Sequence, residues 1–208
     1  MKPAAPICRV RWGIAEHPLA GETRSGDAAL VVEQEQGCLL AVADGLGHGA
    51  EAAEAAEAGM KALRHAAQHS VLQLLRDCHE ALRGTRGAVM SLAWIDYREA
   101  QLTWAGVGNV NGMLLRARET GEGAHEYLLC RGGTLGLQLP PPYAAITTVA
   151  PGDTLVLFTD GLDQAAVSGF NDLISPPDRA AATLLRTCER GKDDALVLVA
   201  RYALETGS

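Results

Sequence analysis

The sequence has few aromatic residues and no long hydrophobic run. Phe, Trp and Tyr make up only 4% of the 208 residues, so we expect an aliphatic core built from Leu, Val and Ala. No apolar stretch approaches ~20 residues, which excludes a membrane-spanning helix and a membrane partner. The first six residues lack the apolar segment of a signal peptide, so a cytoplasmic protein is expected.

Excess positive charge and cysteine motifs are also missing. The formal net charge is -7, and no basic run offsets it, which argues against nucleic-acid binding. The five cysteines are dispersed and lack Cys-x-x-Cys spacing, which is typical of reduced core thiols. The length and the 48% hydrophobic content predict one globular domain.

What the sequence does contain is a series of short apolar runs. Residues 39–43 are five apolar residues followed by Asp44, which predicts a strand buried on both faces. Residues 28–33 predict the preceding strand, and residues 35–37 the turn between the two. An antiparallel hairpin would bring Asp27 and Asp44 to the same edge.

Two regions have apolar residues at the spacing of an α-helix. Residues 50–82 are rich in alanine and lack proline, which predicts one long helix or two with a break at residues 68–70. Prolines at 176 and 177 begin another helix, which ends before Gly191. His65 and His69 have the i,i+4 spacing of metal ligands, but no third ligand is near, so a solvated helix face is favoured.

The remaining apolar runs predict further strands. Residues 7–14 suit a strand near a sheet edge. We expect consecutive hairpins to form a meander from residues 88–96, 101–106, 111–118 and 126–130, with a tip at 121–123. Another hairpin is expected from residues 146–149 and 154–159, and a last strand from 195–202. The glycines of residues 106–112 superficially resemble a dinucleotide fingerprint, but a strand follows them, so a tight turn is favoured.

Aspartates recur at the ends of these strands. Asp44 alone could be a turn or helix cap. It is joined, however, by similar placements in Ser25-Gly26-Asp27, Phe158-Thr159-Asp160-Gly161 and Lys192-Asp193-Asp194-Ala195. Clustered carboxylates repel unless hard divalent cations neutralise them. Two such ions about 3.5–4 Å apart can activate a water for phosphate-ester hydrolysis.

These ordered motifs resemble the metal-dependent type 2C (PPM) protein serine/threonine phosphatases. The similarity includes Asp44-Gly45-Leu46-Gly47-His48-Gly49, Trp104-Ala105-Gly106-Val107-Gly108-Asn109 and Gly133-Thr134-Leu135-Gly136-Leu137. Within the family the chain is most similar to the bacterial branch containing SpoIIE, RsbU and especially RsbX. The resemblance covers residues 7–202, which implies a single phosphatase domain with these bounds. The resemblance implies an α+β fold, an αββα sandwich of two antiparallel sheets flanked by helices.

The resemblance also implies roles for individual residues. Asp44 would bridge two Mn²⁺ or Mg²⁺ ions, and the Gly45 carbonyl would bind one of them. Asp160 and Asp193 would bind the second ion. Asp27 would hold metal-bound water or help to ligate, and Asp194 would support the metal site. Catalysis in the family is by metal-bound water that attacks phosphoserine or phosphothreonine.

The chain departs from the family in its phosphate-binding residue. Eukaryotic members carry an arginine shortly before the first aspartate, where this sequence has Glu22. Arg24 or Arg131 could replace it, or each could be a surface arginine. His48 could donate a proton to the leaving group or merely shape its loop.

The implied function is dephosphorylation of stressosome proteins, RsbS-like and RsbR-like substrates with STAS domains. The alternative substrate is a phosphorylated anti-anti-sigma factor, as in the SpoIIE and RsbU group. A hypothesis from another class is a non-catalytic module that binds a partner. A monomer is one expectation, and the sequence leaves the oligomeric state open.

Overall fold

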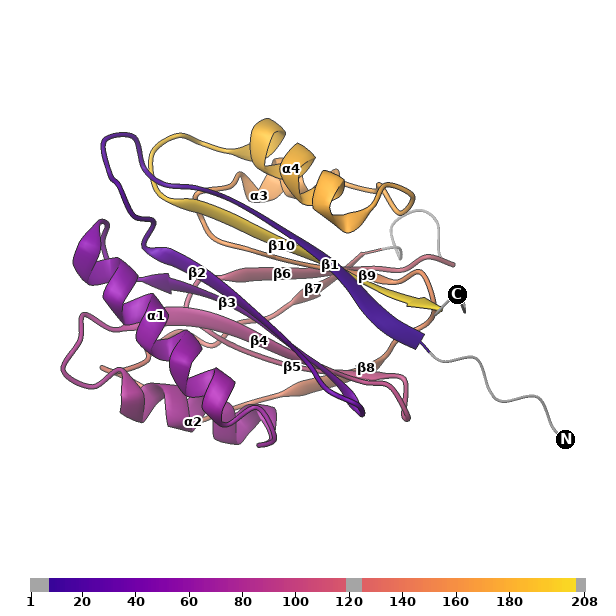
Figure 1. Cartoon of the computed structure of the whole chain (residues 1–208), viewed down its shortest axis with the longest axis horizontal. Coiled ribbons are helices and arrows are strands. Elements are labelled where there is room, and N and C mark those ends of the chain that lie inside the picture. Colours follow the sequence, from indigo (N-terminus) through magenta and orange to yellow (C-terminus); the bar gives the residue numbers. More distant parts are fainter. Residues whose placement is uncertain (1–7, 119–124, 205–208) are drawn as a thin grey trace, which may run out of the picture.

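The computed structural model describes residues 8–118 and 125–204, and it consists of two stacked antiparallel sheets with helices outside them (Figure 1). The first sheet has the order β1 (Cys8–His17), β10 (Ala195–Leu204), β9 (Thr154–Phe158), β6 (Asn111–Leu115) and β7 (His125–Leu128). The second has the order β2 (Asp27–Glu33), β3 (Gly37–Gly45), β4 (Ala88–Asp96), β5 (Gln101–Val107) and β8 (Ala145–Thr148).

Helices cover the outer face of each sheet. Helices α1 (Ala50–His65) and α2 (Val71–Ala81) pack on the second sheet, and α4 (Pro177–Cys188) packs on β1 and β10 of the first, with α3 (Gln164–Ser168) against α4. Three hydrophobic clusters fill the spaces between these four layers. The predicted αββα sandwich is therefore confirmed.

Strand β3 lies between β2 and β4 inside the second sheet and is buried on both faces, as predicted. Because side chains alternate along a strand, Leu39 and Ala41 pack toward α1 and α2, whereas Leu40 and Val42 pack toward the first sheet. The same alternation directs Asp44 to the inner face, where its strand ends.

The helical predictions are confirmed in type and position. The break between α1 and α2 falls at residues 66–70, where the Ser70 hydroxyl accepts from the Gln73 amide at 3.4 Å. Helix α4 has Pro177 in its first turn. His65 Nδ1 approaches the Lys61 carbonyl and His69 Nδ1 approaches Asp77, and both rings are exposed. They therefore lie on a solvated face, as favoured.

The predicted meander is wrong at one step, from β5 to β6. Strands β4 and β5 form a hairpin and so do β6 and β7, as predicted, but β6 and β7 belong to the other sheet. The chain crosses between the sheets through the tight turn at Gly108, which has a φ of +92°. A tight glycine turn can join two strands of one sheet or connect one sheet to the other, and the sequence around the turn does not distinguish these two cases.

The predicted hairpin of residues 146–149 and 154–159 is also wrong. Strand β8 pairs with β5, whereas β9 pairs with β10 and β6. Three prolines, residues 140–142, precede β8, and β8 is an edge strand, the position that a proline-rich approach favours. Strand β1 is likewise at an edge. The short helix α3 was not predicted.

Some predictions fall outside the described residues or are untested. The hairpin tip at residues 121–123 and residue 7 of the predicted domain lie outside them. The one-domain division itself stays a prediction. Cys38, Cys78, Cys130 and Cys188 are unpaired, and all but Cys130 are buried. Across the two described ranges, no helix has the length and apolarity needed to span a membrane.

Candidate active site

The site begins with a pair of aspartates on adjacent strands. Asp27, the first residue of β2, lies directly opposite Asp44 near the end of β3. The Gly45 amide donates to the Gly26 carbonyl at 3.0 Å, which closes the pairing at this edge. Asp27 is 6% exposed. The predicted hairpin therefore does bring the two carboxylates together.

The first sheet contributes a residue that bonds to this pair. Thr159 follows β9 and is fully buried, and its hydroxyl donates to Asp27 Oδ2 at 2.7 Å. The same hydroxyl accepts from the Leu196 amide at 2.9 Å. Asp160 comes next in the chain, and Asn109 Nδ2 donates to its Oδ2 at 2.7 Å. Asp160 is thus held at the edge where Asp27 lies.

The start of β10 brings two more aspartates. Asp194 is 3% exposed; its Oδ1 accepts from the Leu19 amide at 2.7 Å and its Oδ2 from the Gly26 amide at 2.8 Å. Both oxygens therefore anchor the loop that precedes Asp27, and the role of Asp194 at a metal site stays a prediction. Asp193 is exposed, and its Oδ1 accepts from the Asp194 amide at 2.9 Å.

The connecting segments that carry these residues meet at one end of the sandwich. Figure 1 shows the β1–β2 loop, the start of α1 and the segment before β10 together at the left end. This placement follows from the topology, since β3 and β9 end there and β2 and β10 begin there.

Mutual repulsion and burial perturb the carboxylates. Burial, together with the charge of Asp44, raises the pKa of Asp27 to about 8, although the Thr159 hydrogen bond opposes the shift. Burial and the charges of Asp160 and Asp193 raise the pKa of Asp44 to about 7. Burial and Asp193 also raise the pKa of Asp160, against the effect of Arg190. The five aspartates, Asp194 included, thus form one electrostatic cluster.

The chemistry of this cluster fits hard divalent cations. All its side-chain donors are carboxylate oxygens, the ligands that Mg²⁺ and Mn²⁺ prefer. Within residues 8–118 and 125–204, no three His, Cys, Asp or Glu side chains converge into a ready-made cage. The support for a metal site here is therefore the charge and the donor type of these side chains, not a preformed geometry.

The glycines after the two strand-end aspartates have a packing role. A Cβ on Gly45 would lie 2.0 Å from the Ala52 carbonyl oxygen of α1. A Cβ on Gly161 would lie 2.0 Å from the Asp194 carbonyl oxygen. Each glycine therefore lets a backbone segment pack directly against the end of its strand. Metal binding by the Gly45 carbonyl stays a prediction.

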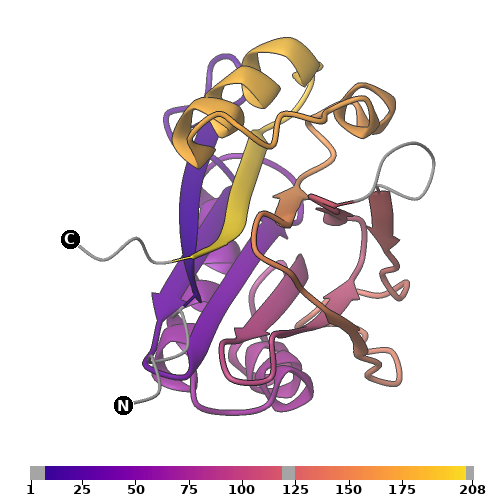
Figure 2. The same ribbon diagram turned by 90° about the vertical axis from the view of Figure 1, so that its right-hand side faces the viewer.

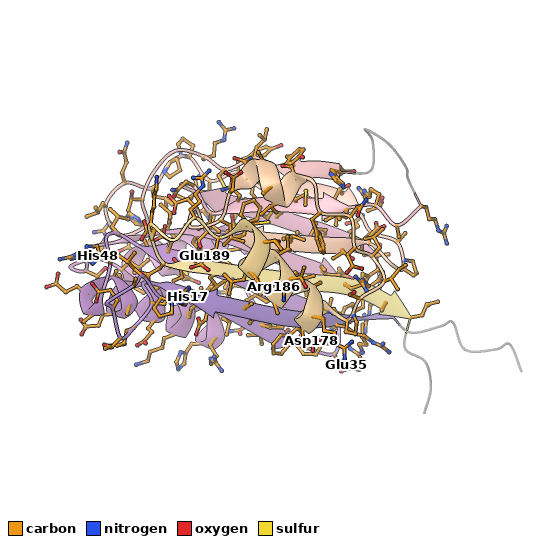
Figure 3. The ribbon with its side chains drawn as sticks, turned by 90° about the horizontal axis from the view of Figure 1, so that it is seen from above. His17, Glu35, His48, Asp178, Arg186 and Glu189 are labelled. Atoms are coloured by element: carbon orange, nitrogen blue, oxygen red, sulfur yellow. The ribbon has the colours of Figure 1, made fainter. Side chains whose placement is uncertain are left out.

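His48 lies at the outer end of this region (Figure 3). Its Nδ1 is 2.7 Å from Glu22 Oε1, and its side chain is 62% exposed. Glu22 stands where the eukaryotic members have an arginine. In this chain the residue at that position contacts His48 instead of supplying a positive charge. The contact with Glu22 fixes the His48 ring. It is compatible with both predicted roles of His48, proton donation to the leaving group and shaping of the loop.

Neither arginine considered from the sequence bonds to the aspartate cluster. Arg24 pairs with Glu57 of α1 at 2.7 Å. Arg131 lies over the Tyr143 ring, 5.2 Å from its centroid. Both arginines contact other parts of the surface. The interpretation that they are surface arginines is therefore better supported than a role in phosphate binding.

Sequence reasoning missed Thr159 and Arg190. The Arg190 amide donates to the Gly161 carbonyl at 2.9 Å, and its guanidinium lies 3.6 Å from Asp163. Its charge lowers the pKa of Asp160. The alternation of β9 could have placed Thr159 inward, but no local pattern marks Arg190.

The fold is that of PP2C-type protein phosphatases. The family described as Stage II sporulation protein E (SpoIIE) matches residues 34–203, and the chain belongs to it. The phosphoserine phosphatase RsbX of Bacillus subtilis (strain 168) is 31% identical over 144 residues, which are 69% of this chain and 70% of RsbX.

Solved structures agree with this assignment. RsbX in complex with magnesium superimposes with a TM-score of 0.82 at 23% identity, over 93% of this chain and 96% of that one. A chain from work on the bacterial stressosome as a modular system for secondary messenger signaling has a TM-score of 0.83 at 31% identity, over 93% and 100% of the two chains. The predicted family and the phosphatase class are confirmed.

Proposed function

We propose that this phosphatase hydrolyses phosphoserine or phosphothreonine on stressosome proteins, with two bound Mn²⁺ or Mg²⁺ ions. The main support is the convergence of Asp27, Asp44, Asp160 and Asp193 from both sheets at one edge, with raised pKa values where burial is deepest. The likeness to RsbX and to a stressosome-related chain supports the substrate class.

Each aspartate has a role in this proposal. Asp44, Asp160, Asp193 and the Gly45 carbonyl would hold the ions, with Asp44 shared between them. Asp27 would hold water beside the ions or help to bind them, and Asp194 fixes the loop before Asp27. The ions, when bound, supply an activated water and a polarised phosphoryl oxygen.

The chain's own residues would complete the hydrolysis. Water adds to phosphorus, the bond from phosphorus to the serine or threonine oxygen breaks, and that oxygen takes up a proton. With Nδ1 held by Glu22, His48 Nε2 is the nitrogen left to supply this proton. Arg190, beside the Asp160 turn, attracts the phosphoryl group in place of the eukaryotic arginine.

The enzyme test uses p-nitrophenyl phosphate and a phosphorylated RsbS-like protein, with Mn²⁺ or Mg²⁺ and then with chelator. Chelation and Asp44→Asn are each expected to remove at least ~99% of turnover, since both abolish the ion-held water. Asp178→Asn, on the exposed start of α4, is the matched control. Turnover without metal, or an active Asp44→Asn variant, contradicts the proposal.

Two alternatives have distinct outcomes. Faster dephosphorylation of an anti-anti-sigma factor than of an RsbS-like protein would assign the chain to the SpoIIE and RsbU group of substrates. Partner binding without metal binding, measured by calorimetry, would favour the non-catalytic module. The cytoplasmic location and the monomeric state stay predictions.

A further inference from the structure

A hollow of about 300 Å³ opens where β7 and β8 form the free edges of the two sheets. Leu102 and Trp104 of β5 line it from within, and Leu128 of β7 and Ala145 of β8 line its sides. Figure 2 shows these rose and orange strands on the side away from β1 and β10. The hollow is therefore separate from the β1–β10 side of the sandwich.

One of the residues that line the hollow has an unsatisfied donor. Trp104 is 2% exposed, and its Nε1 is the single buried side-chain nitrogen or oxygen in the described ranges that lacks a hydrogen-bond partner. Leaving a buried N–H unpaired costs about 1–3 kcal/mol. A ligand oxygen that reached Nε1 from the hollow would satisfy this donor.

The rim of the hollow extends its apolar surface. Tyr127, Leu129, Tyr143 and Ile146 are each at least 50% exposed, and all of them line it. A clustered set of exposed apolar side chains is typical of a protein-binding surface. The adjoining strands are sheet edges, which an extended peptide can pair with.

A positive charge lies beside the rim, whereas Glu126, the charged residue that lines the hollow, is paired with Arg116. The Arg131 guanidinium stacks on Tyr143 and forms no ion pair with any residue that the structure describes. In a chain of net charge -7, such a cation favours an acidic or phosphorylated ligand.

The backbone connects this rim to the active site. The Arg131 amide donates to the Gly106 carbonyl at 2.9 Å, and the Gly108 amide donates to the Arg131 carbonyl at 2.8 Å. The next residue, Asn109, donates to Asp160. A segment bound in the hollow could therefore continue past Arg131 toward the aspartate cluster.

We propose that the hollow docks an extended segment of the phosphoprotein substrate. An apolar side chain of the segment fills the hollow, a carbonyl oxygen accepts from Trp104 Nε1, and an acidic residue lies against Arg131. This inference rests on the proposed function, because the occupant is the substrate protein.

Kinetics on two substrates test the proposal. For Ile146→Asp we expect the ratio of kcat/KM on phosphorylated RsbS-like protein to kcat/KM on p-nitrophenyl phosphate to fall at least ~10-fold, because the charge disfavours the apolar anchor. Trp104→Phe, which removes the N–H and keeps an aromatic ring, should lower the same ratio. Ile174→Asp, at a position 93% exposed and outside the hollow, is the control and should leave the ratio unchanged.

A binding measurement separates this proposal from the proposed function. In ¹⁵N-labelled protein, the Trp104 indole N–H resonance should shift downfield when the phosphorylated protein is added, even with chelator present. An indole shift without turnover on either substrate would retain docking and refute the proposed function. Turnover with an unchanged ratio and no indole shift would refute docking alone. A shift that depends on the chain's own concentration, lost in Ile146→Asp, would show a second copy as the occupant and overturn the proposal.

Discussion

The Thr159 hydroxyl donates to Asp27 Oδ2 at 2.7 Å, and this hydrogen bond joins the two sheets at the edge where the carboxylates meet. Because the hydroxyl also accepts from the Leu196 amide, one side chain satisfies two buried groups. The position of Asp27 therefore depends on the packing of β9 and β10 as well as on its own strand.

Replacing this hydroxyl should destabilise the protein. Thr159→Val keeps the side-chain shape but leaves both Asp27 and the Leu196 amide without their partner, so we expect the free energy of unfolding to fall by about 1–3 kcal/mol. Urea denaturation measures it. Thr187→Val, on the exposed face of α4, should change stability by less than ~0.5 kcal/mol. Equal effects of the two substitutions would contradict the role given to Thr159.

Stability without metal should fall as the pH rises. Asp27 and Asp44 have pKa values near 8 and 7 in the folded protein, against about 3.9 in an unfolded chain. Between about pH 4 and 8 the folded state thus binds more protons at these two groups, and their contribution to stability declines with pH.

Thermal unfolding in chelator at a series of pH values measures this decline. Asp27→Asn should flatten the pH dependence, because its amide does not titrate, and Asp178→Asn should retain the wild-type slope. Saturating Mg²⁺ should raise the melting temperature most at high pH, where the ion no longer competes with protons. An apo protein equally stable at pH 5 and 8, with no change in Asp27→Asn, would refute the assignment.

The close approach of α1 to the end of β3 gives a third prediction. In Gly45→Ala the new methyl group would meet the Ala52 carbonyl oxygen at 2.0 Å, so helix and strand must separate. We expect a loss of about 1–3 kcal/mol of stability, together with weaker metal binding in calorimetry. Gly132→Ala, where a Cβ meets nothing within 4 Å, is the matched control. A stable Gly45→Ala variant would show that the two segments are free to move apart.

Arg190 should affect substrate binding rather than the stability of the fold. Its guanidinium is 48% exposed, so Arg190→Ala is expected to leave the melting temperature nearly unchanged. The loss of positive charge beside Asp160 should lower kcat/KM on p-nitrophenyl phosphate about 10-fold, mainly through KM. Arg190→Lys should recover part of the lost kcat/KM. The control is Arg186→Ala on exposed α4 (Figure 3); similar kinetics in both alanine variants would argue against the assignment.

Local patterns accounted for the strands and the aspartate pair. Asp27 and Asp44 could be paired from sequence because a short turn joins their strands and fixes the register. The sheets to which β6 and β8 belong could not be predicted from sequence, since the turn at Gly108 and the proline segment before β8 are compatible with either sheet. Thr159 and Arg190 were missed for a similar reason, because their partners are far away in the sequence.

The anchoring of Gly26 by Asp194 spans 168 positions of the chain, and it bears on when the enzyme becomes active during its synthesis. The residues around Asp27 leave the ribosome well before the carboxylate that fixes their loop. Contacts of such long range form late and slowly. A nascent chain that has not yet reached Asp194 therefore lacks the anchor of this loop, and the aspartate cluster is assembled only after that residue has been made.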